Sequence, residues 1–154
     1  MARQDATLWR PDTCDCEFYI RVDSDGNPIY LDHNQVIAEH QARINAKDPT
    51  ANPVISRPAK ACDVHSGMGH SVGKTLFNVV KEENQRKNIA LDEVRKALDI
   101  PDDKAGEIND HCVWSFDQDR NLNVMVISPL AQAKRSALQA VLHSKFGEGK
   151  VRIS

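Results

Sequence analysis

Strand-forming apolar and aromatic residues are concentrated in two short stretches near the amino terminus. The first stretch, 16–22, is rich in strand-forming residues, and the second, 29–31, resumes the same pattern. Between them lies the run Asp23-Ser-Asp-Gly-Asn-Pro28, which is a dense signal for a chain reversal. The pattern therefore predicts a β-hairpin in this part of the chain.

The next stretch, 33–59, combines a helical pattern with several prolines. The residues that recur at helical spacing predict a short helix: Val36, Ile37, His40 and Ile44. Pro49, Pro53 and Pro58 then exclude a continuous helix or a central strand, because proline lacks the backbone N–H that both require. The residues 54–56 can form an edge strand. We expect the whole stretch to form a Pro-rich arm at the surface.

A long helix is expected to run from Ser71 or Thr75, either of which can cap its start, to about Leu98. Both of its ends carry apolar residues at helical spacing. Its middle, 81–88, contains no apolar residue at all. The helix is therefore either continuous with a solvent-exposed centre or broken into two near Asn88.

The last third of the chain predicts two strands, a helix and a further strand. Alternating residues mark strands at 113–116 and 122–127, and a short polar turn joins them. Pro129 opens a helix that Gly147 ends, and 150–154 forms the last strand. The helix should bury one apolar stripe: Leu130, Ala133, Ala137, Val141 and Leu142.

Together these elements predict an α+β fold, with an N-terminal β-hairpin region, one or two central helices and a C-terminal β-β-α-β unit. A loop containing Pro101 and Gly106 leads into that unit. The length of 154 residues is typical of one domain, so we expect a single domain. Its parts are the regions 1–70, 71–100 and 108–154. Only 40% of the residues are hydrophobic and 5% are aromatic, so a bound metal would help to stabilise a modest core.

The charge and the hydropathy of the chain argue against nucleic acid and membranes as its partners. The formal net charge is −2 and the isoelectric point is about 6.3, which gives no overall attraction to nucleic acid. No stretch reaches the roughly 20 apolar residues of a membrane span, and no secretory signal is visible at the start. We expect a reducing cytoplasm, where four cysteines indicate metal ligands or buried thiols before disulfides.

Four metal-ligating residues fall into two close pairs. Cys14-Asp-Cys16 is a C-x-C pair, and Cys62-Asp-Val-His65 is a C-x2-H pair. We expect Cys14, Cys16, Cys62 and His65 to bind one Zn2+ at tetrahedral corners. The site would be structural, because a catalytic zinc keeps one position open for water. The alternatives are ordinary small buried thiols with a surface histidine, and a Cys14–Cys62 disulfide, which a reducing compartment disfavours.

Two residues are reserve candidates for the metal site. His70 lies five residues after His65 and could replace it as the fourth ligand. Cys112 begins an apolar strand, which favours a buried thiol. Its neighbour His111 points to the opposite face of that strand, so a catalytic Cys–His pair is not expected.

Three other patterns approach known binding sequences without matching them. The stretch 67–75 ends in Gly-Lys-Thr like a phosphate-binding loop, but Met68 stands where the pattern needs its first glycine. The runs 23–26 and 117–121 resemble fragments of calcium loops but lack the required glycine and glutamate. Basic residues around Arg86 alternate with acidic ones, which favours a solvated, ion-paired helix face over a nucleic-acid contact.

Three different segments together form a further pattern: Leu8-Trp-Arg-Pro-Asp-Thr-Cys-Asp-Cys16, Cys62-x2-His65 and Glu82-Glu-Asn-Gln-Arg-Lys-Asn88. Together they resemble small uncharacterised proteins encoded by bacteriophages. The stretch 33–59 is longer than in that pattern and could be an added arm. The resemblance implies a viral origin and no established activity.

These observations favour a non-enzymatic, zinc-stabilised phage protein that acts as a structural or protein-interaction module. It would be a virion component or a host-interaction factor in the host cytoplasm. The expected partner is another protein, either a virion protein or a second copy of the chain, and not a membrane. One alternative is a nucleic-acid-associated zinc protein with its contact around Arg86. Another is a metal-dependent enzyme with an open zinc near His70.

Overall fold

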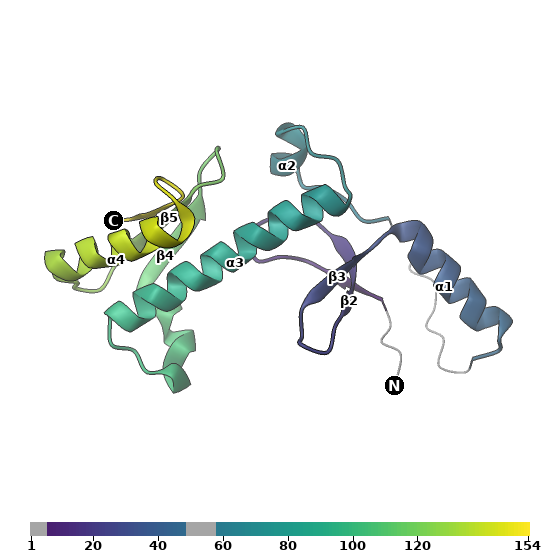
Figure 1. The fold of residues 1–154 in the computed structure, drawn as a ribbon, viewed down its shortest axis with the longest axis horizontal. Helices are drawn as coiled ribbons and strands as arrows, with labels where there is room; N and C mark the ends of the chain where they lie inside the picture. The colour runs from purple at the N-terminus through teal and green to yellow at the C-terminus, as the bar shows by residue number, and fades with distance from the viewer. Residues whose placement is uncertain (1–5, 49–57) are drawn as a thin grey trace. The chain divides into compact units, whose positions relative to one another are not determined.

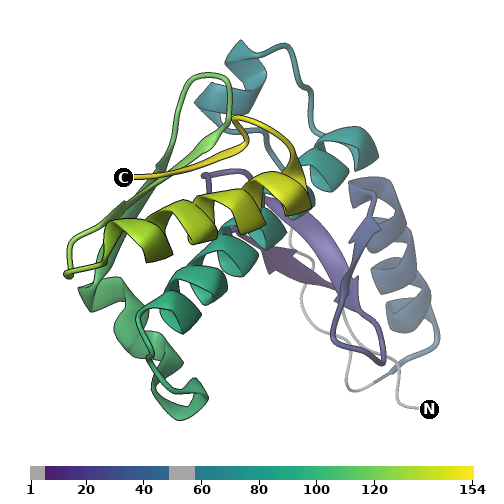
Figure 2. The same ribbon diagram turned by 60° about the vertical axis from the view of Figure 1, so that its left-hand side comes forward.

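The computed structural model describes residues 6–48 and 58–154. Their contacts define two compact units, of which the first ends at Lys81 and the second begins at Glu82. Each unit contains a three-stranded sheet and helices, so the protein is mixed α+β and the predicted fold class is confirmed (Figure 1, Figure 2). The edge strand expected at 54–56 lies outside the described residues.

The sheet of the first unit contains the predicted hairpin. Strands β2 (Phe18–Val22) and β3 (Pro28–Leu31) pair antiparallel, and β1 (Thr7–Trp9) pairs with the other edge of β2. At the turn, the carboxylate of Asp23 accepts hydrogen bonds of 2.9 and 2.8 Å from the backbone N–H groups two and four residues further on. The hairpin is therefore confirmed. Strand β1 is not predicted, because three residues are too few to show an alternation.

One face of β2 forms the core of the first unit together with the first turns of α3 (Lys74–Ala97). Phe18 and Ile20 point to the same side of the strand and are buried. The rings of Trp9 and Phe18 each lie 5.6 Å from the ring of Phe77, measured between centroids. Two of the predicted metal ligands belong to the same buried cluster, so the site lies beside a dry aromatic core.

Helix α1 (His33–Asn45) follows β3, at the place where the pattern predicts a short helix. None of its thirteen residues is buried. Two side-chain contacts attach it to β2. The ring of His33 stacks on Tyr19 at 5.5 Å, and Arg21 forms an ion pair of 2.6 Å with Glu39. The helix therefore lies at the surface of the unit.

Helix α3 runs without interruption for 24 residues and passes through the boundary between the units. It begins at Lys74, where the carbonyl of Gly73 accepts a hydrogen bond of 2.9 Å from the N–H of Phe77. The capping position is therefore Gly73, and neither Ser71 nor Thr75 occupies it.

Helix α3 is not broken at Asn88. Three charged residues in its polar middle are buried, although the sequence pattern favours their exposure. Glu83, Arg86 and Lys87 are 2%, 5% and 7% exposed. The guanidinium of Arg120 donates to both carboxylate oxygens of Glu83, with a shortest distance of 2.8 Å. Arg86 donates to the backbone carbonyl of Arg120 at 3.0 Å. The expectation of a solvent-exposed centre is wrong because these partners come from a turn much further along the chain.

The second unit contains the predicted β-β-α-β order. Strands β4 (Cys112–Phe116) and β5 (Leu122–Val126) pair antiparallel. After helix α4 (Gln132–Phe146), strand β6 (Val151–Ile153) pairs parallel to β5. The inward side chains of the sheet form one buried cluster with α4 and the second half of α3.

Two details of the second unit differ from the sequence pattern. Helix α4 buries Leu138 and Leu142. Three members of the predicted stripe are exposed: Ala133, Ala137 and Val141. Packing selects the leucine face because leucine buries more apolar surface than alanine. The predicted loop around Gly106 is a 3-10 helix, η1 (Asp102–Asp110), which buries only Ile108. Short 3-10 segments are common connectors.

Candidate metal centre

A short backbone pairing brings the two predicted ligand pairs together. Cys14 and Cys16 lie in the loop between β1 and β2, and Glu17 forms an isolated antiparallel bridge with Lys60. Two backbone hydrogen bonds of 2.9 and 3.1 Å join these bridge residues. Cys16 precedes Glu17, and Cys62 follows Lys60 by two residues. The bridge therefore places the second pair of ligands against the first.

The side chain of Glu17 strengthens the same pairing. It is 2% exposed and accepts a hydrogen bond of 2.7 Å from Arg10, while the ammonium group of Lys60 lies 3.8 Å away. Sequence reasoning missed this residue. A glutamate beside a cysteine gives no local signal of burial, because its partners come from elsewhere in the chain.

Cys62 caps helix α2 (Asp63–Gly67) and orients the fourth candidate ligand. Its sulfur accepts a hydrogen bond of 3.5 Å from the backbone N–H of His65. The His65 residue is fully buried. The N–H of Cys62 itself donates to the sulfur of Cys16 at 3.3 Å. These two hydrogen bonds hold the sulfurs of Cys16 and Cys62 in position beside His65.

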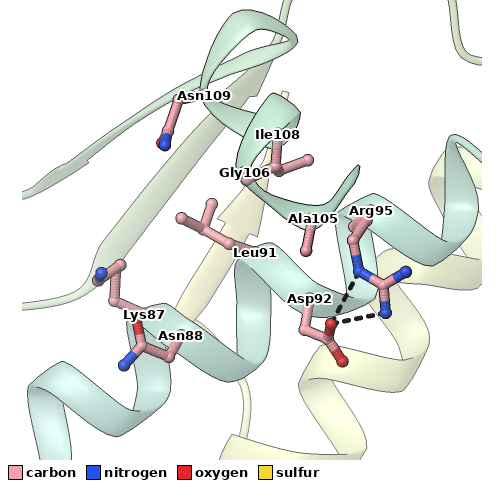
Figure 3. Close-up of a pocket in the computed structure, with 9 residues that line it drawn as sticks. All are labelled: Lys87, Asn88, Leu91, Asp92, Arg95, Ala105, Gly106, Ile108 and Asn109. Carbon is pink, nitrogen blue, oxygen red and sulfur yellow. Dashed lines mark hydrogen bonds and ion pairs between the residues drawn. The ribbon is translucent and has the colours of Figure 1, made fainter. Parts of the chain in front are cut away.

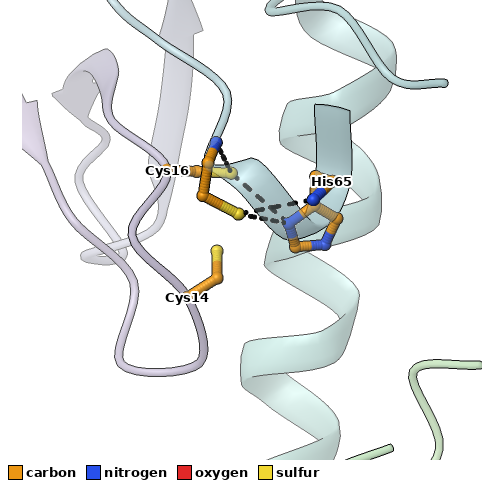
Figure 4. A group of neighbouring side chains, drawn as sticks. Cys14, Cys16 and His65 are labelled. Carbon is orange, nitrogen blue, oxygen red and sulfur yellow. Dashed lines mark hydrogen bonds between the residues drawn. The ribbon is translucent and has the colours of Figure 1, made fainter. Parts of the chain in front are cut away.

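The four candidate side chains converge on one point. Their ligand atoms all lie within 4.8 Å of one another, and Figure 4 shows Cys14, Cys16 and His65 pointing toward a common centre. Nδ1 of His65 lies 3.4 Å from the sulfur of Cys16 and 3.1 Å from that of Cys62. One imidazole nitrogen has a single N–H or a single lone pair, so it cannot hydrogen-bond well to both sulfurs. A metal ion bound at the centre satisfies all four groups at once, and this group can hold one.

The thiols of Cys14 and Cys16 share one hydrogen bond, which shifts their pKa values in opposite directions. The hydrogen bond from Cys16 is the main cause that lowers the pKa of Cys14 to about 6. The same hydrogen bond, together with burial, raises the pKa of Cys16. Without a metal, Cys14 is therefore the first of the two thiols to lose its proton, and Cys16 keeps its own. Metal binding would displace this proton, because thiolates are the ligands.

The two reserve candidates lie outside the group of four. The ring of His70 is half-buried, with its centroid 6.2 Å from that of His65. Cys112 is buried in the second unit, where its thiol donates to the carbonyl of Ile108 at 3.4 Å and burial raises its pKa. Its neighbour His111 contacts Ser128 instead, with Nδ1 2.5 Å from the hydroxyl oxygen.

The structure does not form the disulfide, the phosphate-binding loop or the calcium loops that parts of the sequence resemble. All four cysteines, each within the described part of the chain, are free thiols, so a Cys14–Cys62 disulfide is not formed. The stretch 67–75 runs from the last residue of α2 into the first turn of α3, whereas a phosphate-binding loop follows a strand. The calcium-like runs 23–26 and 117–121 are both hairpin turns.

Comparisons with protein-family models, with curated proteins and with solved structures found no match for this chain. Among the described residues, no helix combines the length and the apolar composition needed to cross a membrane. The Cys/His group is therefore the observation from which function is argued.

Proposed function

We propose that Cys14, Cys16, Cys62 and His65 bind one Zn2+. Three thiolates and one imidazole suit zinc, whereas magnesium and calcium prefer oxygen ligands. With Zn–S bonds of about 2.3 Å and a Zn–N bond of about 2.1 Å, tetrahedral angles place sulfur about 3.6 Å from nitrogen. The two sulfur–nitrogen distances, 3.1 and 3.4 Å, are both shorter than this value, so the ligands need to move apart only slightly to admit the ion.

The proposed zinc has a structural role. Protein side chains supply all four tetrahedral positions, whereas a catalytic zinc keeps one for water or substrate. The observation that carries the proposal is the convergence of four ligand atoms, of which three belong to fully or almost fully buried side chains. Such a zinc cross-links the loop before β2 to the start of α2, and its binding free energy becomes folding free energy of the first unit.

We further propose that the protein comes from a bacteriophage and acts by contact with another protein rather than by catalysis. It would be a virion component, or a factor that binds a host protein in the host cytoplasm. Helix α1 supports a contact function. Ile37 and Ile44 are 39% and 47% exposed, and their seven-residue spacing places them on one face of the helix. A protein partner or a second copy of the chain can cover such a stripe.

Burial of the basic residues on α3 weighs against the alternative nucleic-acid function. The guanidinium of Arg86 lies 5.7 Å from the ring centre of Phe116, and the ammonium of Lys87 lies 5.3 Å from that of Trp114. Both cations are almost completely buried. Phosphate contacts require charges that reach the surface, so this part of α3 does not offer the contact on which that hypothesis depends.

The zinc proposal is tested by elemental analysis of the purified protein. We expect one zinc per chain, and Cys62→Ser should remove it. Cys112→Ser is the matched control, because it changes a buried thiol outside the group and should leave the zinc in place. A wild-type protein that is folded and free of metal would contradict the proposal.

The contact proposal is tested on α1. Replacing Ile37 and Ile44 together by serine should lower the amount of the protein in purified phage particles, measured by mass spectrometry against infected-cell lysate. It should also reduce any self-association measured by sedimentation. Ile29→Ser is the control, because Ile29 is a similarly exposed apolar residue on β3, at 45%. If the double variant matches wild type in both measurements, α1 is not the contact surface.

A further inference from the structure

The sheet of the second unit has two edge strands, β4 and β6, and the edge at β6 is covered by a side chain. Gln139 of α4 donates a hydrogen bond of 2.8 Å to the backbone carbonyl of Val151 and accepts one of 2.8 Å from the N–H of Ile153. The side-chain amide thus takes the place of a neighbouring strand. This contact closes the β6 edge to further pairing, as proteins commonly do at exposed sheet edges.

The edge at β4 has no such cover within residues 6–48 and 58–154. At the two ends of the strand, the backbone of His111 and of Asp117 hydrogen-bonds at 2.8 and 2.9 Å to the residues that flank β5. Bonded pairs recur at every second residue of an antiparallel ladder, so the N–H and C=O groups of Cys112, Trp114 and Phe116 point away from β5. No hydrogen bond joins these outward groups to another described residue.

Strand β4 also lacks the residues that usually protect an open edge. Its five residues include no charged residue and no proline. Val113 and Ser115 lie on the face opposite the buried cluster, and Val113 is 51% exposed. The start of the strand is fixed, because the thiol of Cys112 donates to the carbonyl of Ile108, whose side chain shares the buried cluster of Leu91 (Figure 3). The open edge is therefore held in an extended form.

We propose that β4 pairs with β4 of a second copy of the chain, antiparallel about a twofold axis at Trp114. The two three-stranded sheets then form one sheet of six strands. In this register Trp114 pairs with its own counterpart, and Cys112 pairs with Phe116 of the second copy, so all the outward backbone groups gain partners. A twofold contact uses the same surface on both copies and closes at a dimer.

The groups at the two ends of β4 favour a second copy as the partner. The same register places His111 opposite Asp117 of the second copy, and the twofold axis forms this pair twice. Nδ1 of His111 contacts Ser128, and Oδ1 of Asp117 accepts the hydrogen bonds of its own turn. Nε2 of the imidazole and Oδ2 of the carboxylate are left for the contact between copies. Complementary groups directly opposite each other stabilise a strand pairing, whereas like charges there destabilise it.

This dimer uses a surface separate from α1, so it does not rest on the contact proposed there. The variant with serine at Ile37 and Ile44 should still form it. Any self-association through α1 would instead join dimers into larger species, which that variant would lose. The failure of one contact is therefore distinguishable from the failure of the other.

Sedimentation equilibrium of the purified full chain should show a reversible equilibrium between monomer and dimer, and hydrogen exchange identifies the surface. As the protein concentration rises, the amides of Cys112, Trp114 and Phe116 should exchange more slowly. The amides of Val113 and Ser115 face β5 and should change much less. A chain that stays monomeric at millimolar concentration overturns the proposal and leaves the edge to an extended segment of another protein. A dimer in which the three outward amides gain no protection overturns it as well.

Paired variants test the register. His111→Asp places two carboxylates opposite each other at both ends of the contact, so it should raise the dissociation constant of the dimer at least tenfold. Adding Asp117→Asn should restore most of the affinity, because the asparagine amide donates to the new carboxylate while its side-chain oxygen keeps the turn. Asn123→Asp is the control, because it makes the same change in formal charge on the central strand β5 and should leave the constant unchanged. Equal weakening by the two single variants, or no recovery in the double variant, overturns the proposal.

Discussion

Buffering the free zinc at different concentrations should change the stability of the first unit by a calculable amount. A ligand that binds one site in the folded state alone adds RT ln(1 + [Zn]/Kd) to the free energy of unfolding. Above Kd, each tenfold increase in free zinc therefore adds about 1.4 kcal/mol. A small unit unfolds with a urea m-value of about 1–3 kcal/mol per M, so the urea midpoint should rise by about 0.5–1.4 M for each tenfold increase.

The two tryptophans allow this effect to be assigned to one unit. Trp9 packs on Phe18 and Phe77 in the buried cluster that also contains Cys16 and Cys62. The other tryptophan, at position 114, packs against the core of the second unit. In a Trp114→Phe variant, urea unfolding followed by fluorescence reports Trp9 alone, and its midpoint should follow free zinc with the slope given above.

The matched comparison is between two cysteines. Cys62→Ser should abolish the dependence on zinc, whereas Cys112→Ser should keep it, since Cys112 lies outside the group of four. A Trp9 transition that does not move with free zinc would refute the reasoning. An unchanged slope in Cys62→Ser would refute the assignment of that ligand.

Three further changes test other parts of the structure. His65→Ala should lower the zinc content measured by elemental analysis more than His70→Ala, because only His65 places a ring nitrogen among the sulfurs; the reverse result would move the fourth ligand to the Gly-containing loop. Glu83→Gln should lower the free energy of unfolding by about 3 kcal/mol, because a buried arginine then faces a neutral amide; an unchanged urea midpoint for Trp114 fluorescence would contradict this. Asp92→Asn should lower thermal stability at neutral pH but not near pH 2. The pKa of Asp92 is lowered by Arg95, so its contribution exists above the unfolded-state pKa of about 3.9 and disappears as the pH falls. An equal loss at both pH values would show that the carboxylate charge is not responsible.

Local patterns predict the two hairpins because the turns carry their own hydrogen-bonding groups. In each turn an aspartate, Asp23 or Asp117, accepts from the backbone N–H groups two and four residues further on. In each turn the backbone N–H of that aspartate also donates 2.9 Å to the carbonyl of the asparagine four residues on, Asn27 or Asn121. These interactions involve neighbours in sequence, so the residue types alone indicate them.

The sequence predicts which residues form the candidate metal site, but it does not predict the contacts that bring them together. Residue type and close spacing identify Cys14, Cys16, Cys62 and His65. The pairing of Glu17 with Lys60, which brings the two pairs together, connects segments that are distant in the chain. No local periodicity reports a single bridge of this kind. The sequence therefore indicates which side chains can bind a metal, while the folded chain supplies the position.

The polar centre of α3 shows why hydrophobic periodicity fails where ion pairs replace apolar contacts. Arg120 occupies the left-handed region at φ 59°, at the turn position that Gly26 occupies in the first hairpin. An L-residue there costs roughly 1–2 kcal/mol relative to the right-handed region. Its guanidinium is paired with Glu83 at 2.8 Å and lies 4.4 Å from the ring centre of Phe116. Removing one partner of a buried pair of this kind costs about 3–5 kcal/mol, because the other charge is then left buried without compensation. The arginine at this glycine-like position therefore pairs with Glu83 inside the unit, at a part of α3 for which the sequence pattern predicts exposure to solvent.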